Sequence, residues 1–432
     1  MSDSQQRWLL ASAIAAQAVL VAGAAVLAHS GAPPSRVVIV LVVMFIPYAV
    51  TLQFSQQLDG ALSSRVTVAL CALFGLAFAF APPVLSDDLY RYLWEGRLWL
   101  DGVNPYRIPP SDPLLVPLRD ALWEPINNKP LASIYPPLMQ LVFVLSVLLG
   151  GQVWTLKCLA LLGLVGAVLA VARVTGRPGP AAALGLNPLM LSETALNGHF
   201  DVLVGAMLLL AAWSLGEQRL IRAGFAACAA VGLKLVGVIV VPLFGRRREA
   251  LLVAASALAL FLVPIVASGG PDQPVSGLGQ VATRWQGNDS LFGIISFLSH
   301  RLADDPVAGL AARAIAAILF LGLVAAVLRR HRSPLAAARI LVWGLLLLSP
   351  QVHPWSLGWL LPLELAAGGR AALVWSALVL VAYVPLDSWL SEGVWHMPLG
   401  LQVAEYVVVG LALLGDARRP SLSEPALSTI RS

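Results

Sequence analysis

The chain has 432 residues, of which 58% are hydrophobic and only 12% charged, and its mean hydropathy is +0.81. Soluble domains carry roughly 25% charged residues, so this composition excludes an ordinary soluble enzyme and indicates a helical protein that crosses a membrane several times. The net charge of +5 does not indicate nucleic-acid binding, because the basic residues lie mostly in short loops, where they set membrane orientation.

The cysteines and the N-terminus show no sign of a disulfide-bonded secreted domain. Cys71, Cys158 and Cys228 each lie inside an apolar run and form no Cys-x-x-Cys pair, so neither a disulfide framework nor a zinc site is predicted. Cysteines in such positions are typically small buried hydrophobic residues. Arg7 precedes an apolar run of roughly 20 residues, which is too long for a signal-peptide core and predicts an uncleaved first membrane helix.

Charged residues divide the chain into roughly eleven to thirteen apolar spans, so the expected fold is an all-α polytopic membrane protein with one transmembrane domain, residues 1–432. The first three spans are Trp8–Ala28, Val37–Leu52 and Val66–Phe80, and a polar stretch of about 50 residues, Ser86–Tyr135, follows them. The later apolar runs are Leu138–Leu149, Val153–Val171, Ala181–Leu191, Val202–Leu215, Ala223–Leu243, Leu251–Ala267, Leu291–Leu298, Val307–Leu328, Ile340–Leu348, Leu357–Leu365, Ala371–Val384 and Leu399–Leu414. Several are too short to span alone, which predicts broken or re-entrant helices.

The distribution of Lys and Arg predicts the orientation, because these residues favour cytoplasmic loops. Arg7 places the N-terminus inside, so three spans bring the stretch 86–135 to the outside. The short tail 415–432 is expected in the cytoplasm. Alternation places three further polar motifs outside, at 197–201, 283–289 and 349–355. The number of apolar runs at 136–173 and around Lys234 does not match the number of membrane crossings that this orientation requires. A re-entrant or broken helix in each place would resolve the mismatch.

Two adjacent carboxylates, Asp87 and Asp88, open the polar stretch. Ser86 can cap a helix over 87–100, and acids in a first turn suit the helix dipole, so one reading is that both merely cap an interfacial helix. The stretch also carries Arg91 and Glu95, which exceeds what capping requires. We therefore predict that one carboxylate is a general base for an acceptor hydroxyl, since a low-dielectric surrounding can raise its pKa.

Prolines and aromatic residues fill the rest of this stretch. The prolines restrict the backbone and predict a rigid lid over a cavity; among them are Pro105, Pro109, Pro110, Pro113, Pro136 and Pro137. Tyr106 and Tyr135 could stack on sugar rings, or they could be ordinary interfacial aromatics.

Further polar candidates come from the later outer motifs and from inside one apolar run. Asn197, His199 and Asp201 lie at the outer end of a predicted hairpin, where they could contact a phosphate or hydroxyl, although His199 could also be a satisfied interfacial histidine. The i,i+2 spacing of His199 and Asp201 does not share one helix face and makes a poor metal site.

A lysine inside an apolar run is costly and is a functional candidate by default. Lys234 is such a residue, and the alternative is that it snorkels to the interface. Arg284 and His353 are two further candidates on the same side, and cations at this position would stabilise a phosphate leaving group.

These motifs together resemble the GT-C superfamily of integral membrane glycosyltransferases. The stretch SDDLYRYLWEGRLWLDGVNPY (86–106) looks like the acidic motif of their first large extracytoplasmic loop, and IYPPLMQLVF (134–143) is similar to the YPP or HPP motif that ends it. Blocks 186–204, 232–243, 284–292 and 349–363 look like later family motifs. Within the superfamily the chain resembles bacterial polyprenyl-phosphate-mannose-dependent mannosyltransferases, near glycosyltransferase family 87 and the PIG-M type.

The resemblance implies a GT-C-like bundle and transfer of a hexose, with mannose expected, from a polyprenyl-phosphate donor to an extracytoplasmic glycan or lipid acceptor, with inversion. Segment 86–135 would be the catalytic loop, with Asp87 as base and Asp88 as its partner. The implied substrate-binding residues are Arg91, Glu95, Tyr106, Tyr135, Asn197, His199, Asp201, Lys234, Arg284, Trp285 and His353. No soluble C-terminal domain is expected. The expected location is a bacterial cytoplasmic membrane, with both termini inside.

Other classes stay open at this point. A lipid or sugar transporter or flippase is the main alternative, but transporters usually show internal repeats, and none is visible here. A membrane acyltransferase would need a different spacing around His199. The absence of GxGxxG, P-loop, GxSxG and HExxH motifs argues against a nucleotide-sugar donor held by a Rossmann domain. No cofactor is certain, although an Asp-Asp pair could bind Mg²⁺ or Mn²⁺.

Overall fold

The structure is a computed structural model that describes residues 1–57, 62–245, 252, 255, 256, 259, 285–330 and 333–418. In this part of the chain every regular element is a helix, apart from one isolated parallel bridge between Gly287 and Gln351. The expected all-α architecture is therefore confirmed.

The helices of the first half precede, interrupt and follow the long polar stretch in the chain. They are α1 (Asp3–His29), α2 (Pro34–Gln57), α3 (Ser64–Ala79), α4 (Asp88–Leu100), η1 (Pro113–Leu118), α5 (Pro137–Leu148), α6 (Val153–Thr175), α7 (Pro178–Gly185), α8 (Pro188–Leu191), the π-helix η2 (Ser192–Leu196), α9 (Asp201–Gly216), α10 (Leu220–Leu233) and η3 (Leu235–Phe244).

The second half continues with shorter and longer apolar helices. They are α13 (Leu291–His300), α14 (Val307–Arg330), α15 (Pro334–Leu348), η4 (Pro354–Ser356), α16 (Leu357–Ala366), α17 (Ala371–Leu378), η5 (Val379–Tyr383), α18 (Leu386–Glu392) and α19 (Leu399–Ala417).

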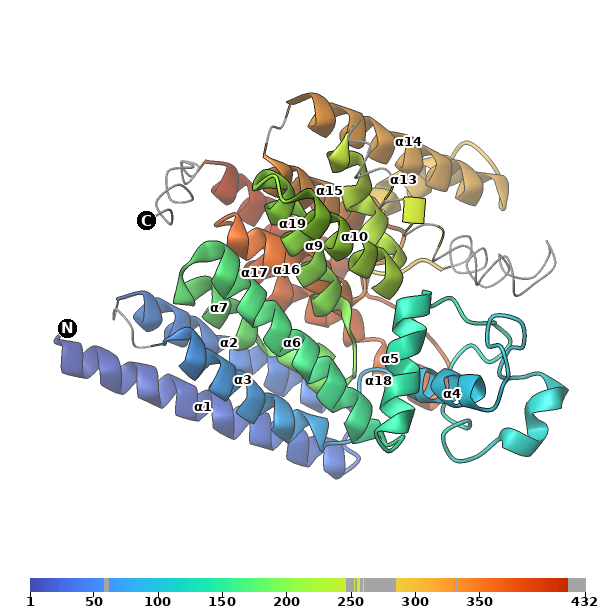
Figure 1. Ribbon diagram of the computed structural model, residues 1–432, viewed down its shortest axis with the longest axis horizontal. Helices are drawn as coiled ribbons and strands as arrows, with labels where there is room; N and C mark the ends of the chain where they lie inside the picture. The colour runs from blue at the N-terminus through green and yellow to red at the C-terminus, as the bar shows by residue number, and fades with distance from the viewer. Residues whose placement is uncertain are drawn as a thin grey trace.

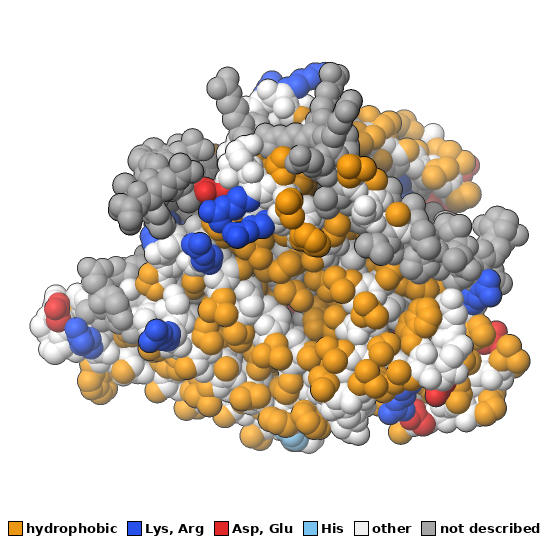
Figure 2. Space-filling view, viewed as in Figure 1, with side chains coloured by type: hydrophobic (Ala, Val, Ile, Leu, Met, Phe, Trp, Pro, Cys, Tyr) orange, Lys and Arg blue, Asp and Glu red, His pale blue; other side chains and the backbone are white. Residues whose placement is uncertain are grey.

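Six helices among the described residues are long and apolar enough to cross a membrane, and a bent pair, Pro188–Leu196 with Asp201–Gly216, adds a seventh if it forms one span. Reaching the expected eleven to thirteen spans would require shorter apolar helices, of 10–17 residues, to cross as well. Hydrophobic side chains cover the middle of the face in Figure 2, and Lys and Arg side chains gather toward its left, where Figure 1 places the N-terminus. This distribution is that of a multi-pass membrane protein.

The long polar stretch lies at one end of the bundle. In Figure 1 the N-terminus is at the left, and the segment that contains α4 and η1 projects at the right. Helix α9 is central, because it packs against α6, α10, α15 and α16 and is buried along most of its length. The N-terminal end of α9 faces the long polar stretch and positions the candidate site.

Two helix breaks bring polar residues to this end. The chain turns by 117° between η2 and α9, where Gly198 has φ +79°, a left-handed conformation that glycine adopts without strain. Helix α10 ends at Lys234, whose backbone is extended, and η3 packs back against α10. The structure thus contains the break that the sequence predicted around Lys234.

Two glycines let α9 and α16 approach closely beside the site. A Cβ on Gly205 would lie 2.0 Å from the carbonyl oxygen of Gly358, and a Cβ on Gly358 would lie 2.8 Å from the carbonyl carbon of Asp201. Any side chain at either position must push the two helices apart, so this contact fixes the start of α9.

We expect Gly205→Ala to destabilise the protein by roughly 1–3 kcal/mol, because overpacking forces a backbone shift. Gly166→Ala in α6 is the matched control, since nothing lies within 4 Å of its added methyl group, and alanine is the better helix former. Apparent melting temperatures in detergent measure the difference. Equal melting temperatures for the two variants would contradict the close approach.

Candidate active site

A cavity of about 300 Å³ lies between α4, the loop before α5, the turn at Lys234 and the segment that precedes α16. From the residues predicted by sequence, it brings together Asp88, Arg91, Tyr135, Lys234, Trp285 and His353. The other lining residues are Tyr92, Asn127, Asn128, Leu131, Ala132, Ile134, Ser349, Pro350, Gln351, Trp355, Ser356 and Trp359. Four separate polar motifs of the sequence therefore meet in one place.

The two carboxylates lie at the first turn of α4, and they do not act as its cap. Ser86 Oγ accepts a hydrogen bond from the backbone N–H of Asp88. Asp87 occupies the N-cap position, but its side chain makes no capping bond. Capping therefore does not account for either carboxylate.

Asn127 joins the two carboxylates. Its Nδ2 donates to Asp87 Oδ1 at 2.5 Å and to Asp88 Oδ1 at 2.6 Å. Partial desolvation and the adjacent charge of Asp88 raise the pKa of Asp87, whose side chain is still exposed at the protein surface. Burial also acts to raise the pKa of Asp88, but the neighbouring His199 and the hydrogen bond from Asn127 outweigh it and lower that pKa to about 2. The two neighbouring carboxylates therefore differ, since the pKa of Asp87 is raised and that of Asp88 is lowered.

A buried polar chain lies behind Asp88. His199 Nε2 is 3.8 Å from Asp88 Oδ2, and His199 Nδ1 is 2.9 Å from Glu193 Oε2. Tyr383 donates its hydroxyl to Glu193 Oε1 at 2.8 Å. His199 is 1% exposed and does not line the cavity, so it supports Asp88 from behind.

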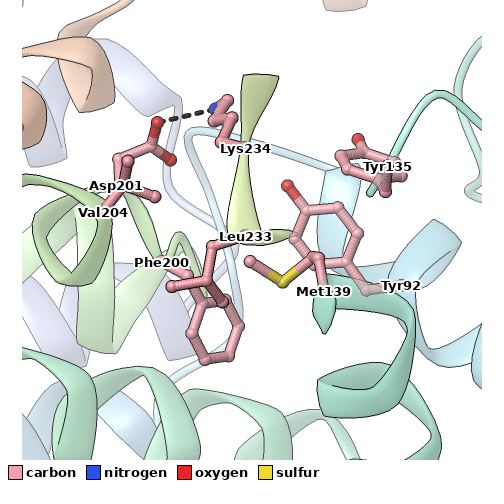
Figure 3. Close-up of a pocket in the computed structure, with 8 residues that line it drawn as sticks. All are labelled: Tyr92, Tyr135, Met139, Phe200, Asp201, Val204, Leu233 and Lys234. Atoms are coloured by element: carbon pink, nitrogen blue, oxygen red, sulfur yellow. Dashed lines mark hydrogen bonds and ion pairs between the residues drawn. The ribbon is translucent and has the colours of Figure 1, made fainter. Parts of the chain in front are cut away.

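The opposite wall contains an ion pair. Lys234 Nζ lies 2.6 Å from Asp201 Oδ1, and Trp359 Nε1 donates to the same oxygen at 2.6 Å. Figure 3 shows this pair facing Tyr92 and Tyr135, with the apolar side chains of Phe200, Leu233 and Met139 below. About a third of the Lys234 side chain is exposed, at 32%, whereas Asp201 is buried. Lys234 is thus a cation presented to the cavity by a buried carboxylate.

Aromatic rings cover the walls between these charges. Trp355 stacks on His353 and packs at a tilt of 35° against His199, with ring centroids 4.1 Å apart in each pair. Burial lowers the pKa of His353 to about 3, so its imidazole is neutral at physiological pH. Tyr135 packs edge-on against Tyr92, with centroids 5.0 Å apart. Flat apolar faces next to hydrogen-bonding groups suit a sugar ring.

Five predicted residues line neither cavity: Asp87 and His199, described above, and Glu95, Tyr106 and Asn197. Glu95 is buried and accepts hydrogen bonds from Ser133 and Gln140. Tyr106 donates its hydroxyl to the carbonyl of Tyr135. Asn197 accepts from the backbone N–H of Leu85, two residues before the carboxylates. Their contacts are with the protein itself.

The remaining predictions concern Arg284 and a metal ion. Arg284 lies outside the described residues, whereas its neighbour Trp285 is in the cavity wall. Within the described ranges no group of three or more His, Cys, Asp or Glu side chains is arranged to hold a metal ion. Binding of Mg²⁺ or Mn²⁺ by the Asp87–Asp88 pair therefore stays a prediction.

The sequence did not single out several residues that build the site. Asn127 lies in an Asn-Asn pair before a proline, a pattern typical of any turn. Lys157 in α6 is completely buried and donates from Nζ to the carbonyl of Ala81, just after α3. This contact holds the segment that leads to Asp87 in place. A lysine within an apolar run was the available signal.

The fold and the cavity define a multi-pass membrane protein with a polar, aromatic-walled site at one end of its helical bundle. The chain belongs to the alpha-(1->6)-mannopyranosyltransferase family, whose N-terminal-domain model matches residues 5–248. Comparison with curated proteins and with solved structures gives no match. The chain is therefore a mannosyltransferase, which implies a sugar donor and a glycan acceptor, and the mannosyltransferase resemblance seen in the sequence is confirmed.

Proposed function

We propose that this protein transfers mannose from a polyprenyl-phosphate donor to an acceptor at the extracytoplasmic face of a bacterial cytoplasmic membrane, with inversion at the anomeric carbon. The observation that carries the proposal is one cavity with Asp88 and Asn127 on one wall and Lys234 on the other, while Asp87 is joined to Asp88 through Asn127. Transfer from a sugar phosphate needs both a carboxylate and a cation, because one substrate loses a proton while the other leaves as an anion.

The donor phosphate is assigned to the Lys234 side. Lys234 presents its ammonium group to the cavity, and Asp201 and Trp359 hold the arrangement from below. A second pocket of about 10 Å³ shares Lys234, Tyr92 and Tyr135 with the main cavity and adds Asp201, Met139, Phe200, Val204 and Leu233 (Figure 3). Apolar side chains therefore lie next to the Lys234–Asp201 ion pair on the side assigned to the lipid phosphate.

Asp87 is assigned as the base, as the sequence predicted. The acceptor hydroxyl oxygen forms a bond to the anomeric carbon while the bond from that carbon to the phosphate oxygen breaks. The acceptor proton passes to Asp87, and the electron pair leaves with the phosphate, whose charge Lys234 balances. The raised pKa of Asp87 suits a proton acceptor, and the lowered pKa of Asp88 keeps a fixed negative charge near the oxocarbenium-like centre.

The family description supports an assignment of the acceptor and the product. The family description specifies an alpha-(1->6)-mannopyranosyl linkage, so we assign the acceptor as a mannose-ended glycan or glycolipid whose 6-hydroxyl is attacked. The cavity wall formed by Asn127, Asn128 and Leu131 lies on the carboxylate side and is where this acceptor would enter. Trp285 and His353 would contact the sugar rings.

The donor class is tested with purified protein in nanodiscs. Polyprenyl-phosphate mannose and GDP-mannose, each labelled in the sugar, are supplied separately with an α-(1→6)-mannose oligosaccharide. We expect label in the oligosaccharide from the lipid donor alone, in a new α-(1→6) linkage. Transfer from GDP-mannose would overturn the donor assignment. Movement of the labelled lipid between leaflets without any transfer would instead support a flippase.

A further inference from the structure

A short segment of the loop between η1 and α5 lines the cavity beside the carboxylate pair. We call residues Asn127–Leu131 the strap. Asn127 is half-buried, and its Nδ2 donates hydrogen bonds to both carboxylates, at 2.5 Å to Asp87 and 2.6 Å to Asp88. A single amide that donates to two neighbouring carboxylates restricts the positions of both side chains. It also supplies positive potential at the one place where their charges repel each other.

One buried guanidinium holds the strap in place. Arg91 is 4% exposed, and its Nη1 donates to the carbonyls of Asn127 and Asn128, each at 3.2 Å. Its Nη2 donates to the carbonyl of Leu131. Its Nε donates to Glu95 at 2.9 Å, and Glu95 is itself held by Ser133 and Gln140. All three side-chain nitrogens of Arg91 therefore donate hydrogen bonds within the protein, and the rigid guanidinium group sets the position of Asn127.

We propose that Asn127 is a positioning residue for the carboxylate pair: its amide holds Asp87 and Asp88 in register and favours the charged form of both. This inference rests on the proposed role of Asp87. It also reassigns Arg91 from substrate contact to support of the strap.

The direction of the expected change follows from the hydrogen bonds. A donor to a carboxylate stabilises the charged form and lowers its pKa. Removal of the Asn127 amide therefore raises the pKa of Asp87, because the repulsion from Asp88 is no longer offset. The base is then protonated, and activity is lost, at a higher pH than in the wild type. A purely structural loss would lower the rate without moving the acid limb of the pH profile.

The test uses Asn127→Ala and Asn127→Asp, with Gln152→Ala and Gln152→Glu as matched controls. Gln152 is exposed in the turn before α6, and its side-chain bond to the carbonyl of Gly150 stays within that turn. For each variant, kcat, KM for the lipid donor and the pH profile of kcat/KM are measured. We expect the Asn127 variants to lose roughly tenfold or more in kcat, with little change in donor KM. The acid limb should move upward in the order wild type, Asn127→Ala, Asn127→Asp.

A second readout does not depend on activity. Carbodiimide labels protonated carboxyl groups, and mass spectrometry of the peptide that carries Asp87 gives the pH at which labelling is half complete. That midpoint should rise in both Asn127 variants and stay unchanged in both Gln152 controls. An unchanged midpoint in Asn127→Ala would overturn the inference. If the midpoint rises while Asp87→Asn keeps full activity, Asn127 positions the pair, and it is the assignment of Asp87 as base that fails.

Discussion

Asp87→Asn is expected to lower mannosyl transfer by roughly 10²–10⁴-fold, the usual contribution of a general base. Asparagine keeps the size of the side chain and an oxygen that can accept from Asn127, so folding should be preserved. The donor KM should change little, because Asp87 is assigned to the acceptor proton and not to the phosphate. Initial rates in nanodiscs with the lipid donor measure the effect.

Two further variants make this result specific. Asp101→Asn removes an exposed carboxylate at the other end of α4 and should leave the rate unchanged. Asp88→Asn should also lower the rate, because the fixed charge beside the reacting carbon is lost. In Asp88→Asn the acid limb should move to lower pH, since the neighbouring charge that raises the pKa of Asp87 is gone. Full activity in Asp87→Asn, with the rate lost only in Asp88→Asn, would move the base to Asp88.

The second large effect is expected at Lys234. Lys234→Met removes the cation assigned to the leaving phosphate, and loss of one such stabilising group costs roughly 10²–10³-fold in kcat. The change also leaves Asp201 buried without its ion-pair partner. We expect a stability loss of about 1–3 kcal/mol, below the ~3–5 kcal/mol of a fully buried pair, because the Lys234 side chain is 32% exposed.

A double variant separates these two effects. Asp201→Asn combined with Lys234→Gln replaces the ion pair with two neutral amides, and the asparagine oxygen can still accept from Trp359. The apparent melting temperature should recover most of the loss seen in Lys234→Met, while transfer should stay low. Recovery of the transfer rate together with stability would show that Lys234 has only a structural role.

The sequence predicted the members of the site better than their partners. Lys234 and the Asp87–Asp88 pair stood out because charges are costly in so apolar a chain. Polar residues on one side of the membrane were expected to converge, and Asp88, Lys234 and His353 do line one cavity. This followed from alternation of the spans and needed no tertiary detail.

The pairings between distant segments could not be read from the sequence. Lys234 meets Asp201 because α10 breaks and the chain bends sharply before α9, and neither break has a periodic signal. Glu95 was expected at the substrate, yet it is satisfied by Arg91, Ser133 and Gln140. In an apolar chain, a charge that serves packing and one that serves catalysis look alike until their hydrogen-bond partners are known.

The central claim is lipid-donor transfer at the extracytoplasmic face, and sealed membrane vesicles of known orientation test it most directly. Right-side-out and inside-out vesicles carry the protein and labelled polyprenyl-phosphate mannose in both leaflets, and a membrane-impermeant α-(1→6)-mannose acceptor is added only to the outer solution. We predict label in the acceptor with right-side-out vesicles and none with inside-out vesicles. Transfer by inside-out vesicles alone would place the cavity on the cytoplasmic side and contradict the account.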